Sequence, residues 1–410
     1  MSLFGLKKST DRYGVLIDIG SGSVLTAIIY SNPKNKYPFI IWSHREHAPL
    51  RNIDSLEQSA KAVMTALMNS SMRLDAEGRK ALFDYDQAAV LSELQCSIAA
   101  PWAYTVTKTI NYKQGAPFII TEELLEELTS TINKKVENDL ASSAALKDLG
   151  LQAITRNTMD MLSNGYRVQD PEGEQATELT LSKTTVVTQE YLIDAITEMQ
   201  NKLFPNTAAR KLSFILMLYA VTRRLLNQSY DVCLIDITYE ATEIGIVRDG
   251  VLSYCTHAPF GSFSLAREIS AVTGVPLHEA FGYLHTESPY SFIKSLPDNQ
   301  QGQIESVFDA YIQQISKLFH ETGDSLSIPK QISLHADLNS ETLFSDLIEK
   351  AVKRSIKSEP RIMPISQEIL QQTYETIDPA TKKQLPKDTA LLLSAQFFHD
   401  QLSAHSFEYL

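Results

Sequence analysis

A turn of small residues separates two apolar runs near the start of the chain, in "VLIDIGSGSVLTAII" at 15–29. The turn follows Asp18 and consists of Gly20, Ser21, Gly22 and Ser23. Consecutive backbone amides at the tip of a β-hairpin form a cradle for an anion, and small side chains let phosphate oxygens reach them. A strand-end aspartate can orient waters on Mg²⁺, which keeps most of its hydration shell. The residue types therefore fit a phosphate-binding hairpin, with a glycine-rich structural turn as the alternative.

The same plan returns in the second half of the chain, in "YDVCLIDITYEATEIGIVRDGVLSYC" from Tyr230. An apolar strand ends at Asp236, a polar turn follows, and a further strand reaches the hairpin signal Asp249–Gly250. Strand-end caps retained for folding are the simpler interpretation of Asp18 and Asp236, and the one we favour for Asp236. The recurrence predicts two related α/β halves, with chance as the alternative.

The elements around these hairpins alternate between strand and helix patterns. Apolar residues at helical spacing predict a helix from Ser55, and Thr121 is expected to cap another. The segment 176–187 predicts a strand, followed by a helix capped by Thr188 and then the apolar run "KLSFILML" as a further strand. This β-α-β order is typical of a layered α/β domain.

Composition limits the function classes. The 410 residues carry 37 Lys and Arg against 49 Asp and Glu, a net charge of −12, which argues against a nucleic-acid binder. The three cysteines lack C-x-x-C spacing, so a zinc site or disulfide framework is not expected and a reducing cytoplasm fits best. No run reaches the ~20 apolar residues of a membrane span. The C-terminal "DTALLLSAQFFHDQLSAHSF" has no Lys or Arg, which predicts a packed helix rather than a membrane-surface helix.

The two hairpins resemble the phosphate-binding hairpins of the actin-like ATPase superfamily, which includes actin, heat-shock chaperones, sugar kinases, FtsA and PilM. The resemblance rests on "LIDIGSGSVLTAII" and on "LIDITYEATEIGIVRDGVL" followed by "PFGSFSLAREI". Between them, "CSIAAPWAYTVTKTI", "ITEELLEELTSTI" and "NGYRVQDPEGEQATELTL" resemble the SHS2-type subdomain inserted in bacterial FtsA and PilM. The likeness covers about 15–270 well and the remainder weakly.

This resemblance implies an α/β protein with the actin-like ATPase fold, made of duplicated ribonuclease-H-like halves and a small inserted α+β subdomain. The expected ranges are 10–90 and 171–224 for the first half (subdomain 1A), 91–170 for the inserted subdomain (1C), and 225–405 for the second half (2A, with a 2B insertion at about 265–328).

The resemblance also implies ATP and Mg²⁺ as ligands, with the two turns facing each other across a cleft. The implied cofactor-binding residues are Asp18, Gly20, Ser21, Gly22, Ser23, Asp236, Thr238, Thr242 and Gly261. Asp18 would face the metal, and the first turn would contact the β- and γ-phosphates. No residue is nominated as catalytic.

The sequence departs from the family pattern where phosphate would bind. Leu25 replaces a Lys that commonly follows the first turn. The second turn has Thr238, Tyr239 and Glu240 in place of glycines, and a carboxylate there would repel a triphosphate unless a cation intervened. The adenosine-cupping Gly-Gly turn is replaced by Ala336 and Asp337. Weak binding of ATP and Mg²⁺ is therefore expected.

These features together predict a bacterial FtsA/PilM-like scaffold, a pseudo-ATPase with weak or lost hydrolysis. Such a protein is cytoplasmic, or peripheral at the inner face of the membrane, and recruits the cytoplasmic tail of a membrane protein, or a division or pilus protein. The alternative is an active Mg-ATP-binding ATPase or small-molecule kinase. The sequence is silent on self-association into filaments, and it leaves cell division and type IV pilus assembly both open.

Overall fold

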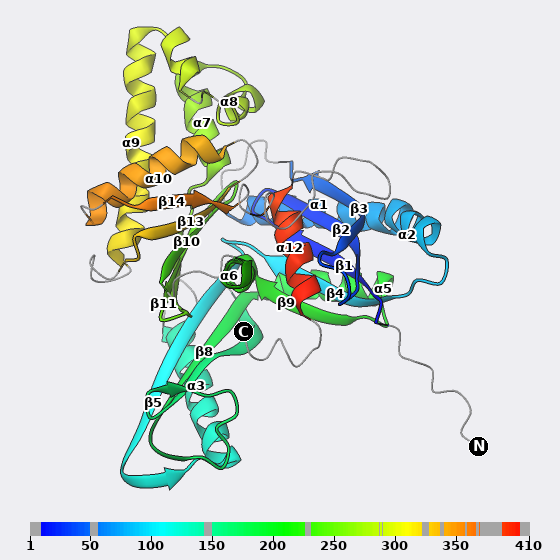
Figure 1. The fold of residues 1–410 in the computed structure, drawn as a ribbon. Helices are drawn as coiled ribbons and strands as arrows, with labels where there is room; N and C mark the ends of the chain where they lie inside the picture. Colours follow the sequence, from blue (N-terminus) through cyan, green and yellow to red (C-terminus); the bar gives the residue numbers. More distant parts are fainter. Residues whose placement is uncertain are drawn as a thin grey trace.

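The computed structural model is a mixed α/β structure with three sheets (Figure 1). It describes residues 10–49, 56–142, 150–225, 231–286, 288, 290–321, 328–336, 340–356, 359–365, 369 and 388–401. Within these ranges, none of the helices combines the length and the apolar character needed to span a membrane.

The first sheet has the strand order β3-β2-β1-β4-β9. Its strands are β1 (Arg12–Ile19), β2 (Ser23–Ser31), β3 (Phe39–His47), β4 (Leu91–Ile98) and β9 (Ala208–Ser213). The first three form an antiparallel meander, whereas β4 and β9 add in parallel to β1. Parallel strands need crossover connections, which helices supply here. These helices are α1 (Leu56–Arg73), the π-helical turn η1 (Leu74–Gly78), α2 (Arg79–Tyr85) and α5 (Glu190–Leu203).

The second sheet repeats this plan with the order β12-β11-β10-β13-β14. Its strands are β10 (Val232–Ile237), β11 (Thr242–Arg248), β12 (Val251–Ala258), β13 (Gln331–Ala336) and β14 (Arg361–Pro364). Again the first three are antiparallel and the last two are parallel to β10. Asp249 and Gly250 both have positive φ, as the predicted Asp-Gly turn requires. The duplicated α/β plan predicted from the two Asp-Ile hairpins is confirmed.

Helices fill the chain between β12 and β13 and flank the second sheet. They are α7 (Ser262–Thr273), α8 (Leu277–Tyr283), the 3₁₀ turn η2 (Ser291–Ser295) and α9 (Asp298–Glu321), and a further helix, α10 (Glu341–Ile356), lies between β13 and β14. In Figure 1 most of α7, α8 and α9 extends beyond one end of the second sheet. Their apolar faces join β10 and β13 in one core, in which Tyr311 and Phe344 are fully buried.

The third sheet is antiparallel throughout, with the order β5-β8-β6-β7. It contains β5 (Ala103–Ile119), β6 (Leu151–Ser163), β7 (Tyr166–Arg167) and β8 (Gln175–Gln189), and α3 (Glu122–Ser142) packs on it. The Thr121 side chain accepts a hydrogen bond from the Leu124 amide, as expected of a helix cap. This sheet has its own small core, which includes Ile132 and Leu179.

Strand pairing shows how the third sheet leaves and rejoins the first. β4, at the start of the range 91–170, pairs in the first sheet, whereas β8, beyond the end of that range, pairs in the third. The chain then returns to the first sheet through α5 and β9. The division of the chain into subdomains by residue range stays a proposal.

Two local predictions around β9 are wrong. The run "KLSFILML" continues as a strand only to Ser213, and α6 (Phe214–Leu225) begins at the next residue. Eight of the twelve α6 residues are buried, and the uninterrupted apolar run that begins the helix has no period that separates it from a buried strand. Thr188 belongs to β8 and donates to the Trp102 carbonyl, so Gln189 precedes α5 in its place.

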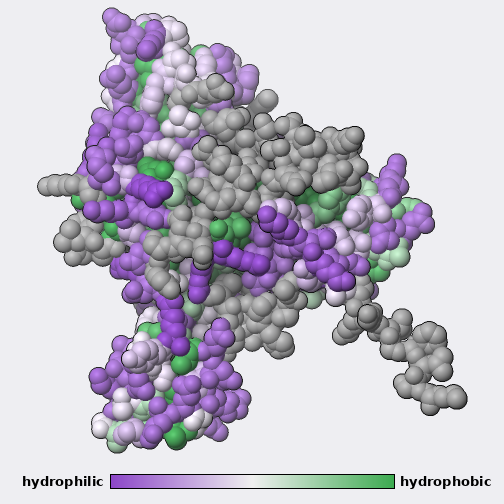
Figure 2. Space-filling model, viewed as in Figure 1, coloured by the Kyte–Doolittle hydropathy of each residue, from purple (hydrophilic) through white to green (hydrophobic). Residues whose placement is uncertain are grey.

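The last helix packs against the first sheet, as predicted. This helix, α12 (Thr389–Asp400), buries Leu391, Phe397 and Phe398 completely or almost so. Gly14 on β1 gives room for it, because a Cβ there would lie 2.4 Å from the Phe398 ring. Hydrophilic residues cover most of the described surface visible in Figure 2.

The third sheet also contacts the second half of the chain. Thr107 on β5 donates to the Leu252 carbonyl on β12, and the rings of Tyr104 and His257 lie 5.1 Å apart. Burial lowers the pKa of His257 to about 4. The third sheet therefore bridges the two halves through a contact that requires a neutral imidazole.

This contact predicts a loss of stability in acid. In the unfolded chain the pKa of His257 is near its ordinary value of 6.5, so below that pH the unfolded state binds a proton. The folded state does not bind this proton until the pH falls to about 4. The free energy of unfolding should fall by about 2 kcal/mol from this group between about pH 7.5 and about pH 5. Urea denaturation of His257→Phe should show that much less acid sensitivity than the parent chain. The same substitution at exposed His278 should leave the sensitivity unchanged, and equal sensitivity in both variants would refute the prediction.

Candidate functional site

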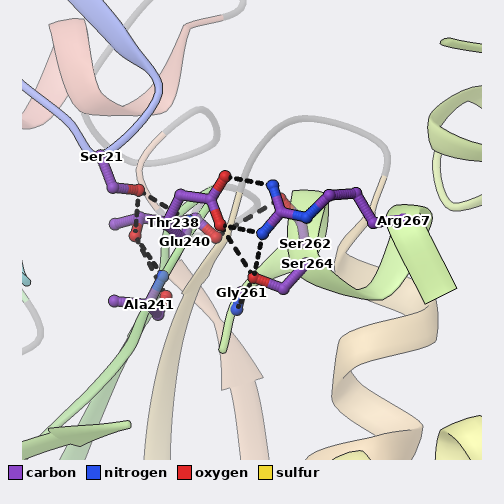
Figure 3. A network of polar contacts seen from close by, with 8 residues as sticks. All are labelled: Ser21, Thr238, Glu240, Ala241, Gly261, Ser262, Ser264 and Arg267. Carbon is purple, nitrogen blue, oxygen red and sulfur yellow. Dashed lines mark hydrogen bonds and ion pairs between the residues drawn. The ribbon is translucent and has the colours of Figure 1, made fainter. Parts of the chain in front are cut away.

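The two hairpin turns face each other, as the resemblance implies, and they touch. The first turn, residues 20–22, joins β1 to β2, and the second turn, residues 238–241, joins β10 to β11. The Ser21 hydroxyl donates to Thr238 Oγ1 at 2.7 Å and accepts from the Glu240 amide at 2.8 Å (Figure 3). The space between the two sheets is therefore closed at this point by direct hydrogen bonds.

The second turn is braced by its own atoms and by the start of α7. The Thr238 amide donates to the Ala241 carbonyl at 2.9 Å, and the Ala241 amide reaches Thr238 Oγ1 at 3.2 Å. The amides of Ser262 and Phe263 donate to the Thr238 and Tyr239 carbonyls at 2.9 and 2.8 Å. Amides at a helix N-terminus commonly bind phosphate. Here the first amides of α7 hold the second turn.

The aromatic ring of Tyr239 adds a further link between the halves. Its hydroxyl lies 3.2 Å from Nδ1 of His47 on β3, and the two rings stack. On its other side the ring contacts Phe263 and Phe281. A bulky residue in the second turn thus packs across the cleft instead of leaving space for a ligand.

The strand-end carboxylates Asp18 and Asp236 are almost fully buried beside the turns. Asp18 Oδ1 accepts from Ser97 at 2.7 Å, and burial raises the Asp18 pKa to about 6 against the opposing effects of Arg45 and this hydrogen bond. Asp236 Oδ1 lies 2.7 Å from His335 Nδ1, and its Oδ2 has no partner among the described residues. Burial and the nearby Asp236 raise the pKa of Glu243 well above its ordinary value.

A cation that the sequence analysis missed lies beside the first turn. Arg45 on β3 is directly opposite Leu25, the position where the family commonly has a Lys. Its guanidinium donates to Ser23 Oγ at 2.7 Å and forms two hydrogen bonds, at 2.7 and 2.9 Å, with Asp388. Burial would raise the pKa of Asp388, but the charge and hydrogen bonds of Arg45 outweigh it and lower the pKa. The charge of Arg45 is thus matched within the chain.

Seven of the nine expected cofactor residues line one small cavity. They are Asp18, Gly20, Ser21, Gly22, Ser23, Asp236 and Thr238. Thr242 and Gly261 are not among its lining residues: Thr242 donates to the Phe260 carbonyl at 2.8 Å, and Gly261 lies against the carbonyls of the second turn. The sequence also gave no indication of Arg45 and His335, which line the cavity.

The cavity is too small for the phosphates of a nucleotide. Its volume is 30 Å³, far below the ~300–1,000 Å³ of ordinary ligand pockets. A second cavity of 240 Å³ shares Arg45, Tyr239, His335 and Ala390 with it. Mg²⁺ would bring several waters of its own, and the described residues contain no group of three or more His, Cys, Asp or Glu placed to hold a metal. As arranged, these residues do not fit a hydrated Mg²⁺ ion with a triphosphate.

Only part of the expected adenosine-binding loop lies within the described residues. Ala336 ends β13 and lines the 240 Å³ cavity, whereas Asp337 falls outside the described residues. Glu341 begins α10 one residue after Ser340.

The two like-ordered sheets with their facing turns define the actin-like ATPase fold. A solved structure described as the PilM-PilN type IV pilus biogenesis complex is similar, with a TM-score of 0.56, 11% sequence identity, and coverage of 94% of this chain and 98% of that one. At this identity the likeness shows the fold alone.

Other solved structures are less similar. They include the ethanolamine utilization protein EutJ from Carboxydothermus hydrogenoformans, with a TM-score of 0.41, 10% identity, and coverage of 94% of this chain and 89% of that one. A Bacteroides thetaiotaomicron protein with an actin-like ATPase fold and unknown function has a TM-score of 0.41 and 12% identity, with coverage of 95% of this chain and 99% of that one. No protein-family model and no curated protein sequence matches the chain.

The close packing of Gly261 predicts a structural role that a stability measurement can check. A Cβ at Gly261 would lie 2.2 Å from the Thr238 carbonyl oxygen and 2.6 Å from that of Tyr239, so the backbone would have to move. Gly261→Ala should lower the free energy of unfolding by about 3 kcal/mol in urea denaturation. Gly302→Ala, in open space on α9, should raise it by about 0.5–1 kcal/mol. Equal stability of Gly261→Ala and the parent chain would show that this packing is loose.

Proposed function

We propose that the protein is an actin-like scaffold that binds the cytoplasmic tail of a membrane protein, with ATP hydrolysis weak or absent. The observation that carries the proposal is a contrast between two cavities. The space between the turns measures 30 Å³, whereas a groove between the third sheet and the first half measures 640 Å³. The similar PilM structure is a complex with PilN in type IV pilus biogenesis, which favours a protein partner for this fold.

The groove has an apolar floor and a charged rim. Met159, Met161, Val168, Ala220 and Phe397 contribute apolar atoms. Around them, Arg167 pairs with Asp160 at 3.2 Å and Arg224 pairs with Asp400 at 2.5 Å. Sites that bind ligands are commonly apolar clefts with a few placed polar groups. This composition suits a short peptide segment with apolar side chains and a polar backbone.

The strand at the edge of the groove supports an extended occupant. β7 pairs with only Leu162 and Ser163 of β6, and Thr158, Met159 and Asp160 of β6 line the groove beyond that pairing. An extended peptide can add to a sheet edge through backbone hydrogen bonds, while pockets for alternate side chains give specificity. We propose that the tail lies along this part of β6.

Such a role would place the protein in the cytoplasm, at the inner face of the membrane, while its partner crosses the membrane. Division proteins and pilus proteins both remain candidates, and self-association into filaments stays a further proposal. The alternative function, an active Mg-ATP-dependent ATPase or kinase, is favoured by the burial of Asp18 and Asp236 beside the facing turns. It requires the Ser21–Thr238 contact to open.

The proposal predicts that filling the groove abolishes tail binding. Synthetic peptides covering the cytoplasmic tails of membrane proteins encoded beside this gene would be titrated with the full chain and followed by fluorescence anisotropy. Ala220→Arg places a long cation in the groove and should weaken the binding peptide at least ~10-fold, about 1.4 kcal/mol. Ala141→Arg, the same change on the exposed end of α3, should bind normally. Binding by no peptide, or equal binding by both variants, would contradict the proposal.

A further inference from the structure

Glu240, which the sequence suggests would repel a phosphate, is held by partners in the second half. Its Oε1 accepts from Arg267 Nη1 at 2.7 Å, and its Oε2 accepts from Arg267 Nη2 at 2.5 Å and from the Ser264 hydroxyl at 3.0 Å. Figure 3 shows the carboxylate pointing at the Arg267 guanidinium and the Ser264 hydroxyl, both of which belong to α7. The Glu240 side chain is only 11% exposed. The carboxylate is therefore mostly buried and paired, and it is not a free surface charge.

The surroundings of this carboxylate have the chemistry of an anion site. A guanidinium offers two parallel donors that match a carboxylate or a phosphate, and the Ser264 hydroxyl adds a third donor. The first amides of α7 take no part, because they bind the carbonyls of the second turn. Arg267 is two-thirds buried and its charge is matched by Glu240, which raises the Arg267 pKa above its ordinary value through the hydrogen bonds between them. An external anion would have to displace Glu240 to reach these donors.

Glu240 also connects the two halves. While its carboxylate binds α7, its backbone amide donates to Ser21 of the first turn at 2.8 Å. Ser21 in turn donates to Thr238, so the second turn is held between the first turn and α7. One residue thus fixes both the charge and the closure of the cleft.

We propose that Glu240 is an internal substitute for phosphate: its carboxylate occupies the donors that Arg267 and Ser264 present on α7, while its backbone amide binds Ser21 of the first half without a nucleotide. The tail-binding groove plays no part in this inference. The Glu240 side chain then supplies the negative charge that a bound phosphate would otherwise supply. Removal of that carboxylate should open a site for a free anion.

The test is whether removal of the carboxylate creates a response to phosphate. Melting temperatures of the full chain would be measured with about 10 mM inorganic phosphate and with sodium chloride at matched ionic strength. The parent chain should melt at the same temperature in both. Glu240→Ala should melt lower than the parent in chloride and regain at least about 2 °C in phosphate, because an anion bound only to the folded state stabilises it.

Two controls separate this effect from general charge effects. Glu57→Ala removes one exposed carboxylate, which pairs with Lys61 on the surface, and it should show no phosphate-specific gain. Arg267→Ala combined with Glu240→Ala should lose the gain. Glu240→Ser, which also removes the carboxylate and leaves space for an anion, provides the same comparison if the alanine variant does not fold. A phosphate response in the parent chain, or none in either Glu240 variant, would overturn the proposal.

Discussion

The hydrogen bonds between Ser21 and the second turn determine the shape of the central cleft. One hydroxyl from the first half satisfies both Thr238 and the amide of Glu240 in the second half. Buried polar groups are costly when they lose their partners, so the turns can separate only if water or a ligand replaces these bonds. The small cavity beside Asp18 and Asp236 follows from this contact, because the turns lie close together and leave only 30 Å³ there. The actin-like framework is therefore kept while its central site is closed.

The charges around the cleft are matched within the chain. Arg45 binds Asp388, Arg267 binds Glu240, and His335 lies against Asp236. A triphosphate would have to compete with carboxylates that already hold these groups in good geometry. The groove beside the third sheet is larger and has an apolar floor. This distribution suits a protein whose ligand binds between the third sheet and the first half rather than between the turns.

The fold could be predicted because its signals are local. An apolar strand, an aspartate and a small turn recur within 15–29 and 232–247, and the helix before β4 has clear periodicity. α6 could not be predicted, because it begins with an uninterrupted apolar run that is equally typical of a buried strand. The site was predicted only where its residues are neighbours in sequence. Arg45 and Asp388 are 343 residues apart in the sequence, so no local pattern indicates that they pair. Glu240 looks in the sequence like a free charge that would repel phosphate, whereas in the structure it is paired with Arg267.

The most direct test of the closed cleft is hydrogen–deuterium exchange of the peptide that spans the second turn. The amides of Thr238, Glu240 and Ala241 all donate within or across the turns, and amides held by hydrogen bonds in stable structure exchange slowly. Exchange would be followed by mass spectrometry with and without millimolar Mg-ATP. We expect slow exchange without nucleotide and no change when Mg-ATP is added. Rapid exchange without nucleotide that becomes slow with Mg-ATP would contradict this account, because it would mean that the ligand closes the turns.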